Sequence, residues 1–219
     1  MMKNINHSAL IIAAVLIFCV FTGCTTTQKT PQIREPDDHY LGNFNPFQLE
    51  NAMCITKSFS GNLNPCELEM YFAPRTNTVE VHFSYGMNKV ALVFNMEERN
   101  AFFEGIMAYM DAFNAGDIPV RAPDKKNYLT RTPVSVSWGV FGLAYSADTY
   151  VRINYEYLEA GKPYMLATFE NADAKDDDAS SPVMNLYFSP SQLEALCEIV
   201  NQDEFQARVD ELNRQAYQW

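Results

Sequence analysis

Histidine, the commonest general base, is scarce in this sequence of 219 residues, which contains three of them. His82 alternates with Glu80 and Ser84, so a base, a carboxylate and a hydroxyl share one face of an expected strand. These are the residue types of a hydrolytic triad. The motifs GxSxG, HExxH, GxxxxGK[ST] and GxGxxG do not occur in the sequence. We therefore interpret His82 as a solvated strand residue and predict no catalytic residue.

Paired carboxylates offer a second route to hydrolysis, because two acids can cleave a glycosidic bond without histidine. The sequence holds 27 Asp and Glu residues, and no spacing singles out one pair. The densest run is Asp173–Asp178, and clustered carboxylates favour hard cations. This run lacks the alternating acids, the Gly and the distant Glu of an EF-hand loop. We interpret it as a solvated excursion between two strands, and we predict no metal site and no cofactor.

Basic residues gather in one stretch, where Arg121, Lys125, Lys126 and Arg131 surround Tyr128. Cations beside an aromatic ring are typical of sites that grip phosphate or a nucleic-acid strand. The whole sequence carries a formal net charge of −11, which repels phosphate backbones. We therefore interpret the stretch as a solvated connection and expect no nucleic-acid partner.

Three of the five cysteines lie beyond the N-terminal region. Cys54 and Cys66 flank Ser60–Asn62, a turn pattern that places them across an expected hairpin. A disulfide between them is one interpretation, and two unpaired, packed thiols are the other. Cys197 lies among Leu and Val residues and is predicted to be a buried thiol. No two cysteines have CxxC spacing, so the sequence gives no support to a zinc site or a thioredoxin-like site.

The N-terminal segment predicts export. Lys3 precedes thirteen unbroken apolar residues, Ala9–Phe21, and Thr22 and Gly23 follow. A helix of that length spans roughly 20 Å, whereas the hydrocarbon core of a bilayer is about 30 Å thick. A cationic start, a short apolar core and a small residue before the cut are typical of a secretory signal peptide. An uncleaved membrane anchor is the alternative.

Thr22–Gly23–Cys24 resembles the lipobox of bacterial lipoproteins, although Phe21 stands where that family usually has Leu. The resemblance implies cleavage between Gly23 and Cys24, and a diacylated Cys24 that holds the protein to a membrane. Thr25 stands where some families place Asp for retention at the inner membrane. The resemblance therefore favours the outer membrane of the cell envelope. Stable attachment needs more than one acyl chain, which a lipid-modified N-terminal cysteine carries.

Beyond residue 40, apolar and polar residues alternate as in half-buried strands, and the apolar residues then recur with a helical period. Leu68, Met70 and Phe72 form one apolar face of such a strand. Asn95 and Glu98 are spaced as a capping box, which starts a helix. In this first half we expect strands at 53–59, 67–73, 79–85 and 89–94, and a helix that starts after Asn95 and ends at Gly116.

The second half repeats this order with an offset of 94 residues, which aligns Phe94 with Phe188 and Asn95 with Ser189. Ser189 and Gln192 form a second capping box, with Pro at the first helical position. In this half we expect strands at 134–140, 151–157, 164–169 and 183–188, a helix from Ser189, and a last helix at 203–216.

The predicted fold class is α+β, with two ββββα repeats, each an antiparallel sheet with a packed helix, plus a C-terminal helix. In the order of their elements alone, such tandem units resemble PUR and Whirly-type repeats, a resemblance that implies no function. The expected organisation is a signal peptide (1–23), a flexible tether (24–40), a first ββββα unit (41–118), a connection (119–132) and a second unit with the C-terminal helix (133–219).

Anchoring, a tether and the lack of a catalytic motif predict a non-enzymatic binding or assembly module in the cell envelope. Its expected partner is an envelope protein or a glycan. A carboxylate-based envelope hydrolase is the alternative, and a fold of the single-strand nucleic-acid-binding type without that activity is a second one. Tyr150 and Tyr187 lie opposite the apolar faces of their strands and are candidates for a binding surface.

Overall fold

The computed structural model describes residues 40–119, 128–140, 144–159 and 161–216. The predicted signal peptide, the lipidation site Cys24 and all of the predicted tether except Tyr40 lie outside the described residues. Arg121, Lys125 and Lys126 of the basic stretch also lie outside them. The predictions made for those residues therefore stay predictions.

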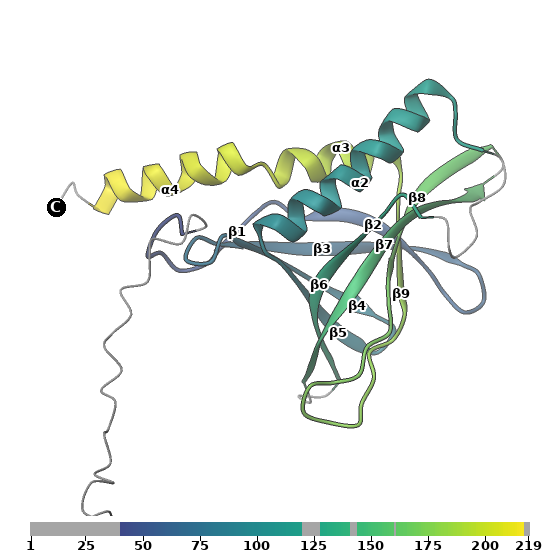
Figure 1. Cartoon of the computed structure of the whole chain (residues 1–219), viewed down its shortest axis with the longest axis horizontal. Helices are drawn as coiled ribbons and strands as arrows, with labels where there is room; N and C mark the ends of the chain where they lie inside the picture. Colours follow the sequence, from purple (N-terminus) through teal and green to yellow (C-terminus); the bar gives the residue numbers. More distant parts are fainter. Residues whose placement is uncertain (1–39, 120–127, 141–143, 160, 217–219) are drawn as a thin grey trace, which may run out of the picture. The chain divides into compact units, whose positions relative to one another are not determined.

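The described residues fold into one antiparallel sheet that closes on itself (Figure 1). The strands run in the order β3–β2–β9–β8–β7–β6–β5–β4, and β4 pairs back onto β3. Eight strands thus form a barrel, in which closure removes the exposed strand edges of an open sheet. The strands are β1 (Phe47–Gln48), β2 (Ala52–Lys57), β3 (Leu63–Ala73), β4 (Thr78–Tyr85), β5 (Asn88–Phe94), β6 (Thr130–Gly139), β7 (Tyr145–Glu159), β8 (Lys162–Phe169) and β9 (Met184–Phe188).

The short strand β1 extends β2 along the same edge of β3. Phe47 pairs with Phe72, and Ala52 pairs with Leu68, so the register continues from β1 into β2 with a shift of one residue. The opposite edge of β3 pairs with β4, from Glu69 to Ala73. Each edge of β3 therefore has its own partner, and only the edge facing β4 is incompletely covered.

The predicted α+β fold with two ββββα units, each with its own sheet, is wrong. Strand β5 pairs with β6 from Lys89–Gly139 to Val93–Ser135, so the two halves of the sequence share one sheet. A second junction, at Ile55 and Tyr187, joins β2 to β9. Alternation shows that each strand has one buried face, but this pattern is the same in an open sheet and in a barrel. The fold implied by the resemblance to PUR and Whirly-type repeats is wrong for the same reason.

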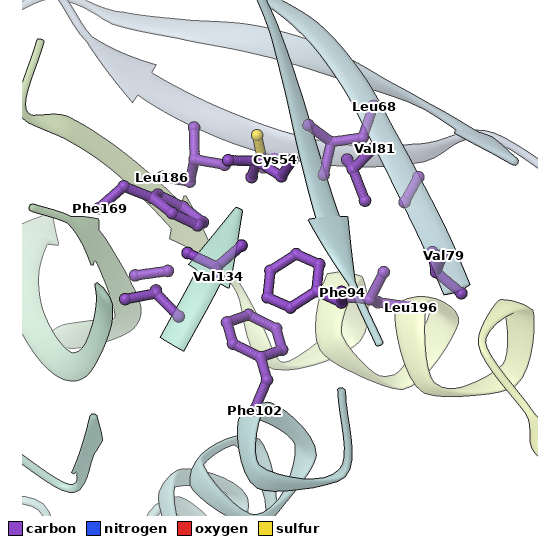
Figure 2. Close-up of a cluster of buried hydrophobic side chains, with 14 of the residues drawn as sticks. Cys54, Leu68, Val79, Val81, Phe94, Phe102, Val134, Phe169, Leu186 and Leu196 are labelled. Atoms are coloured by element: carbon purple, nitrogen blue, oxygen red, sulfur yellow. The ribbon is translucent and has the colours of Figure 1, made fainter. Parts of the chain in front are cut away.

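The interior of the barrel is a packed apolar core. Inward-facing side chains of the strands meet Phe102 of α2 and Leu196 of α3, as Figure 2 shows. The ring of Phe102 lies 5.4 Å from that of Phe94. An apolar cavity of about 50 Å³ remains between them, far too small for a typical ligand pocket. The apolar side chains around this cavity therefore stabilise the fold.

Three helices in the described residues accompany the barrel: α2 (Met96–Ala115), α3 (Pro190–Ile199) and α4 (Gln202–Ala216). Both predicted capping boxes are confirmed. The side chain of Asn95 accepts from Glu98 N and that of Ser189 accepts from Gln192 N. Gly116 ends α2 in the left-handed conformation, at φ 71°, as predicted. None of the helices in the described part of the chain is both long and apolar enough to cross a membrane.

A buried guanidinium joins the N-terminal part of α2 to α4 and to the turn between β3 and β4. Arg99 is 4% exposed and donates to the backbone and side-chain oxygens of Asn77 and to Gln202 Oε1. Its guanidinium also lies 5.5 Å from the ring centre of Phe205. Desolvation lowers the pKa of Arg99 to about 10. These neutral oxygens and the aromatic ring compensate the buried charge, so α2, α4 and the turn are held together.

The closest approach of α2 to the barrel occurs at Gly105. A Cβ at this position would lie 2.2 Å from Thr130 Cγ2 and 2.7 Å from Ile153 Cδ1. We predict that Gly105→Ala lowers the free energy of unfolding by about 1–3 kcal/mol through overpacking, although Ala is the better helix former. Chemical denaturation measures this change. Glu104→Ala, at the exposed neighbouring position, is the control and should change stability by less than about 0.5 kcal/mol. Equal stability of the two variants would contradict the packing shown here.

Candidate functional site

The barrel wall opens where β3 and β4 separate. The two strands pair from Glu69–His82 to Ala73–Thr78 and not beyond. Strand β3 continues to Leu63 with only β2 beside it, whereas β4 continues to Tyr85 with only β5 beside it. A groove of about 560 Å³ lies between the separated strands, and we call it the β3–β4 groove. Its lining residues are Thr56, Pro65, Cys66, Glu67, Glu69, His82, Phe83, Ser84, Lys89 and Val90.

Backbone groups on both sides of the groove lack a strand partner. Leu49 N donates to Met70 O, so the backbone groups of Met70 point toward the edge of β3 that pairs with β1 and β2. Successive residues of a strand direct their N–H and C=O groups to opposite edges, so the even-numbered residues of β3 point toward β2 and the odd-numbered residues toward β4. The N–H and C=O of Glu67 therefore point into the groove. Pro65 also faces the groove but has no N–H to donate. Across the groove, Ser84 faces β3, because it lies two residues beyond the paired His82.

The two predicted disulfide partners meet at this opening. Cys54 on β2 lies directly opposite Cys66 on β3, and both thiols are free. The exposed fraction is 0% for Cys54 and 9% for Cys66, which lines the groove. Cys66 Sγ lies 3.9 Å from Ser84 O and 3.8 Å from Glu67 O. The sequence thus identified residues that face each other, and the disulfide itself stays a prediction.

The two thiols are electronically unequal. A hydrogen bond between them, in which Cys54 donates, raises the pKa of Cys54, and burial raises it further. The same hydrogen bond lowers the pKa of Cys66. Burial alone raises the pKa of Cys197, which is half-buried on α3. Among these three cysteines, Cys66 is the one whose pKa is lowered, and it is also the one that faces the groove.

The triad residue types do not assemble into a triad. His82 Nε2 lies 3.2 Å from Glu80 Oε2, and its ring meets Tyr71 edge-on at 5.4 Å. The Ser84 hydroxyl accepts from Lys89 Nζ at 2.8 Å, so a cation and not an imidazole is its partner. Lysine in this protonated form cannot remove the proton from a serine hydroxyl. The arrangement suits hydrogen-bonded recognition rather than nucleophilic attack.

The carboxylates of the groove stand side by side on one strand. Glu67 and Glu69 are two residues apart on β3, so they project from the same face, about 7 Å apart along the strand. Asn51 Nδ2 donates to Glu67 Oε1 at 2.8 Å. Lys89 is the cation that lines the groove with them, and it is engaged by Ser84. The groove thus presents net negative charge. The alternative of a carboxylate-based hydrolase stays a prediction.

The acidic run lies in the segment between β8 and β9. Asp173 bridges to Ser180, and Ser180 Oγ donates to Asp173 Oδ1 at 2.6 Å. Lys175 pairs with Asp148 on β7 at 2.8 Å. In the described part of the chain, no group of three or more His, Cys, Asp or Glu side chains is arranged to hold a metal ion.

Arg131, the described member of the basic stretch, is already paired. It makes two hydrogen bonds to Glu170, at 3.0 and 2.9 Å, and its guanidinium lies 3.4 Å from the ring centre of Tyr150. Hydrogen bonds from Arg131 lower the pKa of Glu170. Tyr150 is 41% exposed, whereas Tyr187 is buried and donates to Glu156. The two tyrosines therefore do not form the expected binding surface together.

Sequence reasoning missed the groove because it placed the start of β3 at residue 67 instead of at Leu63. The missed stretch contains Pro65, whose lack of an N–H is tolerated only where a strand has no partner on that side. Pro65 could therefore have indicated a free strand edge, but it is not distinctive, because Pro133 and Pro163 also lie within strands.

Comparison with known proteins places the barrel within a described family. A family model with the description "Uncharacterised Treponema protein" matches residues 46–207, which span β1 to the first part of α4. A curated relative from Treponema pallidum (strain Nichols), named "Uncharacterized protein", is 21% identical over 204 residues, covering 93% of this chain and 70% of the relative. No solved structure matches the chain significantly. Neither the family description nor the relative's name states an enzymatic activity.

The order in which the thiols react tests the geometry of the groove. We predict that a small alkylating reagent at neutral pH modifies Cys66 several-fold faster than Cys197, because the pKa of Cys66 is lowered, that of Cys197 is raised by burial, and Cys66 lines the groove. Cys54, fully buried, reacts last. Peptide mapping by mass spectrometry after timed quenching measures each rate. Faster modification of Cys197 than of Cys66 in the folded protein would show that the groove is closed in solution.

Proposed function

The chain belongs to the family described as "Uncharacterised Treponema protein", and from that premise we propose that it is a non-enzymatic binding module of the cell envelope that takes its partner in the β3–β4 groove. The observation that supports this proposal most strongly is the pair of facing strand edges in the barrel wall. The other edges of β3 and β4 are paired with β2 and β5, whereas Glu67 and Ser84 direct backbone groups into an open groove. A free strand edge is a template for an added strand.

The partner that this groove fits best is an extended polypeptide segment. Main-chain hydrogen bonds to Glu67 and Ser84 would hold such a segment, in the manner of strand addition to a sheet. Phe83 and Val90 provide apolar contacts at the base, and the carboxylates of Glu67 and Glu69 favour basic side chains in the segment. A glycan needs exposed aromatic platforms or converging polar side chains, and a strand edge offers it fewer contacts.

The proposed location of this module in the cell rests on the lipoprotein resemblance alone. We propose that Cys24 carries the lipid, that residues after it act as a tether, and that the barrel is held at the outer membrane. A flexible tether of about sixteen residues reaches roughly 20–25 Å, which lifts a domain clear of a lipid surface. The tethered barrel can then search for a partner in the envelope without leaving the membrane.

Site-specific photo-cross-linking in intact cells tests the binding proposal. A photoreactive residue at position 67 should form a protein adduct, whereas the same residue at the exposed position 150, on a different part of the wall, should not. Glu69→Lys in the same chain should weaken the adduct at least several-fold, because it reverses one of the charges expected to attract the partner. Mass spectrometry of the adducts identifies the partner. Equal adducts from both positions refute the groove, and an adduct with carbohydrate would assign the partner to the glycan class.

Metabolic labelling tests the proposed anchor independently. We predict that labelled palmitate is incorporated into the wild-type protein and lost in Cys24→Ala, because the thiol at position 24 is the proposed site of acylation. Cys19→Ala, within the apolar segment, is the matched control and should keep the label. Persistence of the label in Cys24→Ala would show that the lipidation site is wrong.

A further inference from the structure

The thiols at the opening of the barrel have the geometry of a pair that can exchange electrons. Cys54 and Cys66 are registered opposite each other on neighbouring antiparallel strands, where Cα atoms lie about 5.5 Å apart or closer. Disulfides join cysteines whose Cα atoms are about 4.4–6.8 Å apart, so the pair can be bridged with little movement of the backbone. Gly61, at φ 85°, forms the turn that fixes this register.

Access to the pair is one-sided. Cys66 lines the β3–β4 groove, whereas Cys54 is fully buried behind it and does not line the groove. A molecule that enters the groove therefore meets the sulfur of Cys66 first. A hydrogen bond from Cys54 lowers the pKa of Cys66, and the Cys66 thiol itself donates to Glu67 O and Ser84 O. Attack on a disulfide proceeds through the thiolate, and Cys66 is the member of the pair that a molecule in the groove can reach.

We propose that Cys54 and Cys66 form a reversible redox site that is oxidised by small disulfides entering the β3–β4 groove. The Cys66 thiolate attacks one sulfur of the disulfide, a mixed disulfide forms, and the other half leaves as a thiolate that takes up a proton. Cys54 then loses its proton and attacks Cys66 Sγ, which expels the second half as a thiol. The cysteines lose two electrons and two protons in total, and the small disulfide is reduced to two thiols.

The raised pKa of Cys54 does not block the second step. Its main cause is the hydrogen bond to Cys66, followed by burial and by the charge on Cys66. A mixed disulfide at Cys66 carries no charge, so both the acceptor and the repulsion are removed. Cys54 is then positioned beside the sulfur that it must attack.

The disulfide between Cys54 and Cys66 is expected to be easily reduced rather than permanent. Cβ atoms of cross-strand pairs lie about 4.5–5.5 Å apart, whereas a relaxed disulfide holds them at about 3.5–4.5 Å. Closing the bond therefore needs a small approach of the two Cβ atoms, and a bond strained by that approach is reduced more easily. Oxidation also removes the S–H that Cys66 donates to Ser84 O, and so leaves that carbonyl without this donor.

Oxidised glutathione is the probe for this proposal, with the full-length chain and with every cysteine followed by differential alkylation and peptide mapping. The wild type should lose both the Cys54 and Cys66 thiols together and regain them with a reducing agent. Cys54→Ser should stop at a glutathione adduct on Cys66. Cys66→Ser should leave Cys54 reduced, and Cys197→Ser, the matched control, should behave like the wild type.

If a variant fails to fold, measurements on the wild-type protein alone still test whether Cys54 and Cys66 form a redox site. In native conditions Cys66 should be oxidised several-fold faster than Cys197, and unfolding in guanidinium should abolish that difference. Glutathione adducts that accumulate at similar rates on Cys66 and Cys197 in the native protein would overturn the proposal. So would a wild-type protein that keeps its Cys54 and Cys66 thiols. These outcomes do not depend on a polypeptide partner, so they are separate from those of the cross-linking test.

Discussion

The structure depends on the closure of one sheet. Every strand has a backbone that must be paired, and a barrel is the arrangement in which no strand is left at an edge. Two junctions achieve this closure, and they are unequal. Strand β3 pairs with β4 from Glu69 to Ala73, whereas β2 meets β9 in register at Ile55 and Tyr187 alone. Side chains reinforce the weaker junction, because both Lys57 and Tyr187 bind the carboxylate of Glu156 at about 3 Å.

These two limited junctions isolate the outer part of the β2–β3 hairpin. Beyond Glu69, β3 has only β2 beside it, and beyond Ile55, β2 has only β3. In Figure 1 this hairpin extends past the neighbouring strands. The groove and the thiol pair both lie along it. Segments with few pairing partners open at lower free energy than a paired core, so the groove occupies the part of the wall that deforms most easily. The rigid part of the barrel, filled by apolar side chains and covered by α2 and α3, provides the fixed support.

Local chemistry was predictable from the sequence, and closure was not. Asn95 and Ser189 identify helix starts because capping depends on neighbours three residues away, and Gly116 identifies a helix end for the same reason. Ser60–Asn62 likewise locates the turn that brings Cys54 opposite Cys66. The pairing of β5 with β6 and of β2 with β9 joins residues far apart in sequence. Alternation of apolar and polar residues identifies a strand but does not indicate which strands become neighbours. The groove was missed because it consists of strand pairs that do not form, and Pro65 alone could not indicate it, since Pro133 and Pro163 also lie within strands.

The shared hairpin also links binding to oxidation. A disulfide between Cys54 and Cys66 would restrict the β2–β3 hairpin, whereas a bound segment would satisfy the backbone of Glu67 and Ser84 beside it. If one state of the thiols presents the strand edge better, a partner binds that state more tightly. Linkage then requires the bound partner to shift the thiol–disulfide equilibrium by the same factor. Coupling of this kind would need no distant pathway, because the sulfur proposed to react, Cys66 Sγ, lies 3.9 Å from Ser84 O on the strand edge proposed to bind.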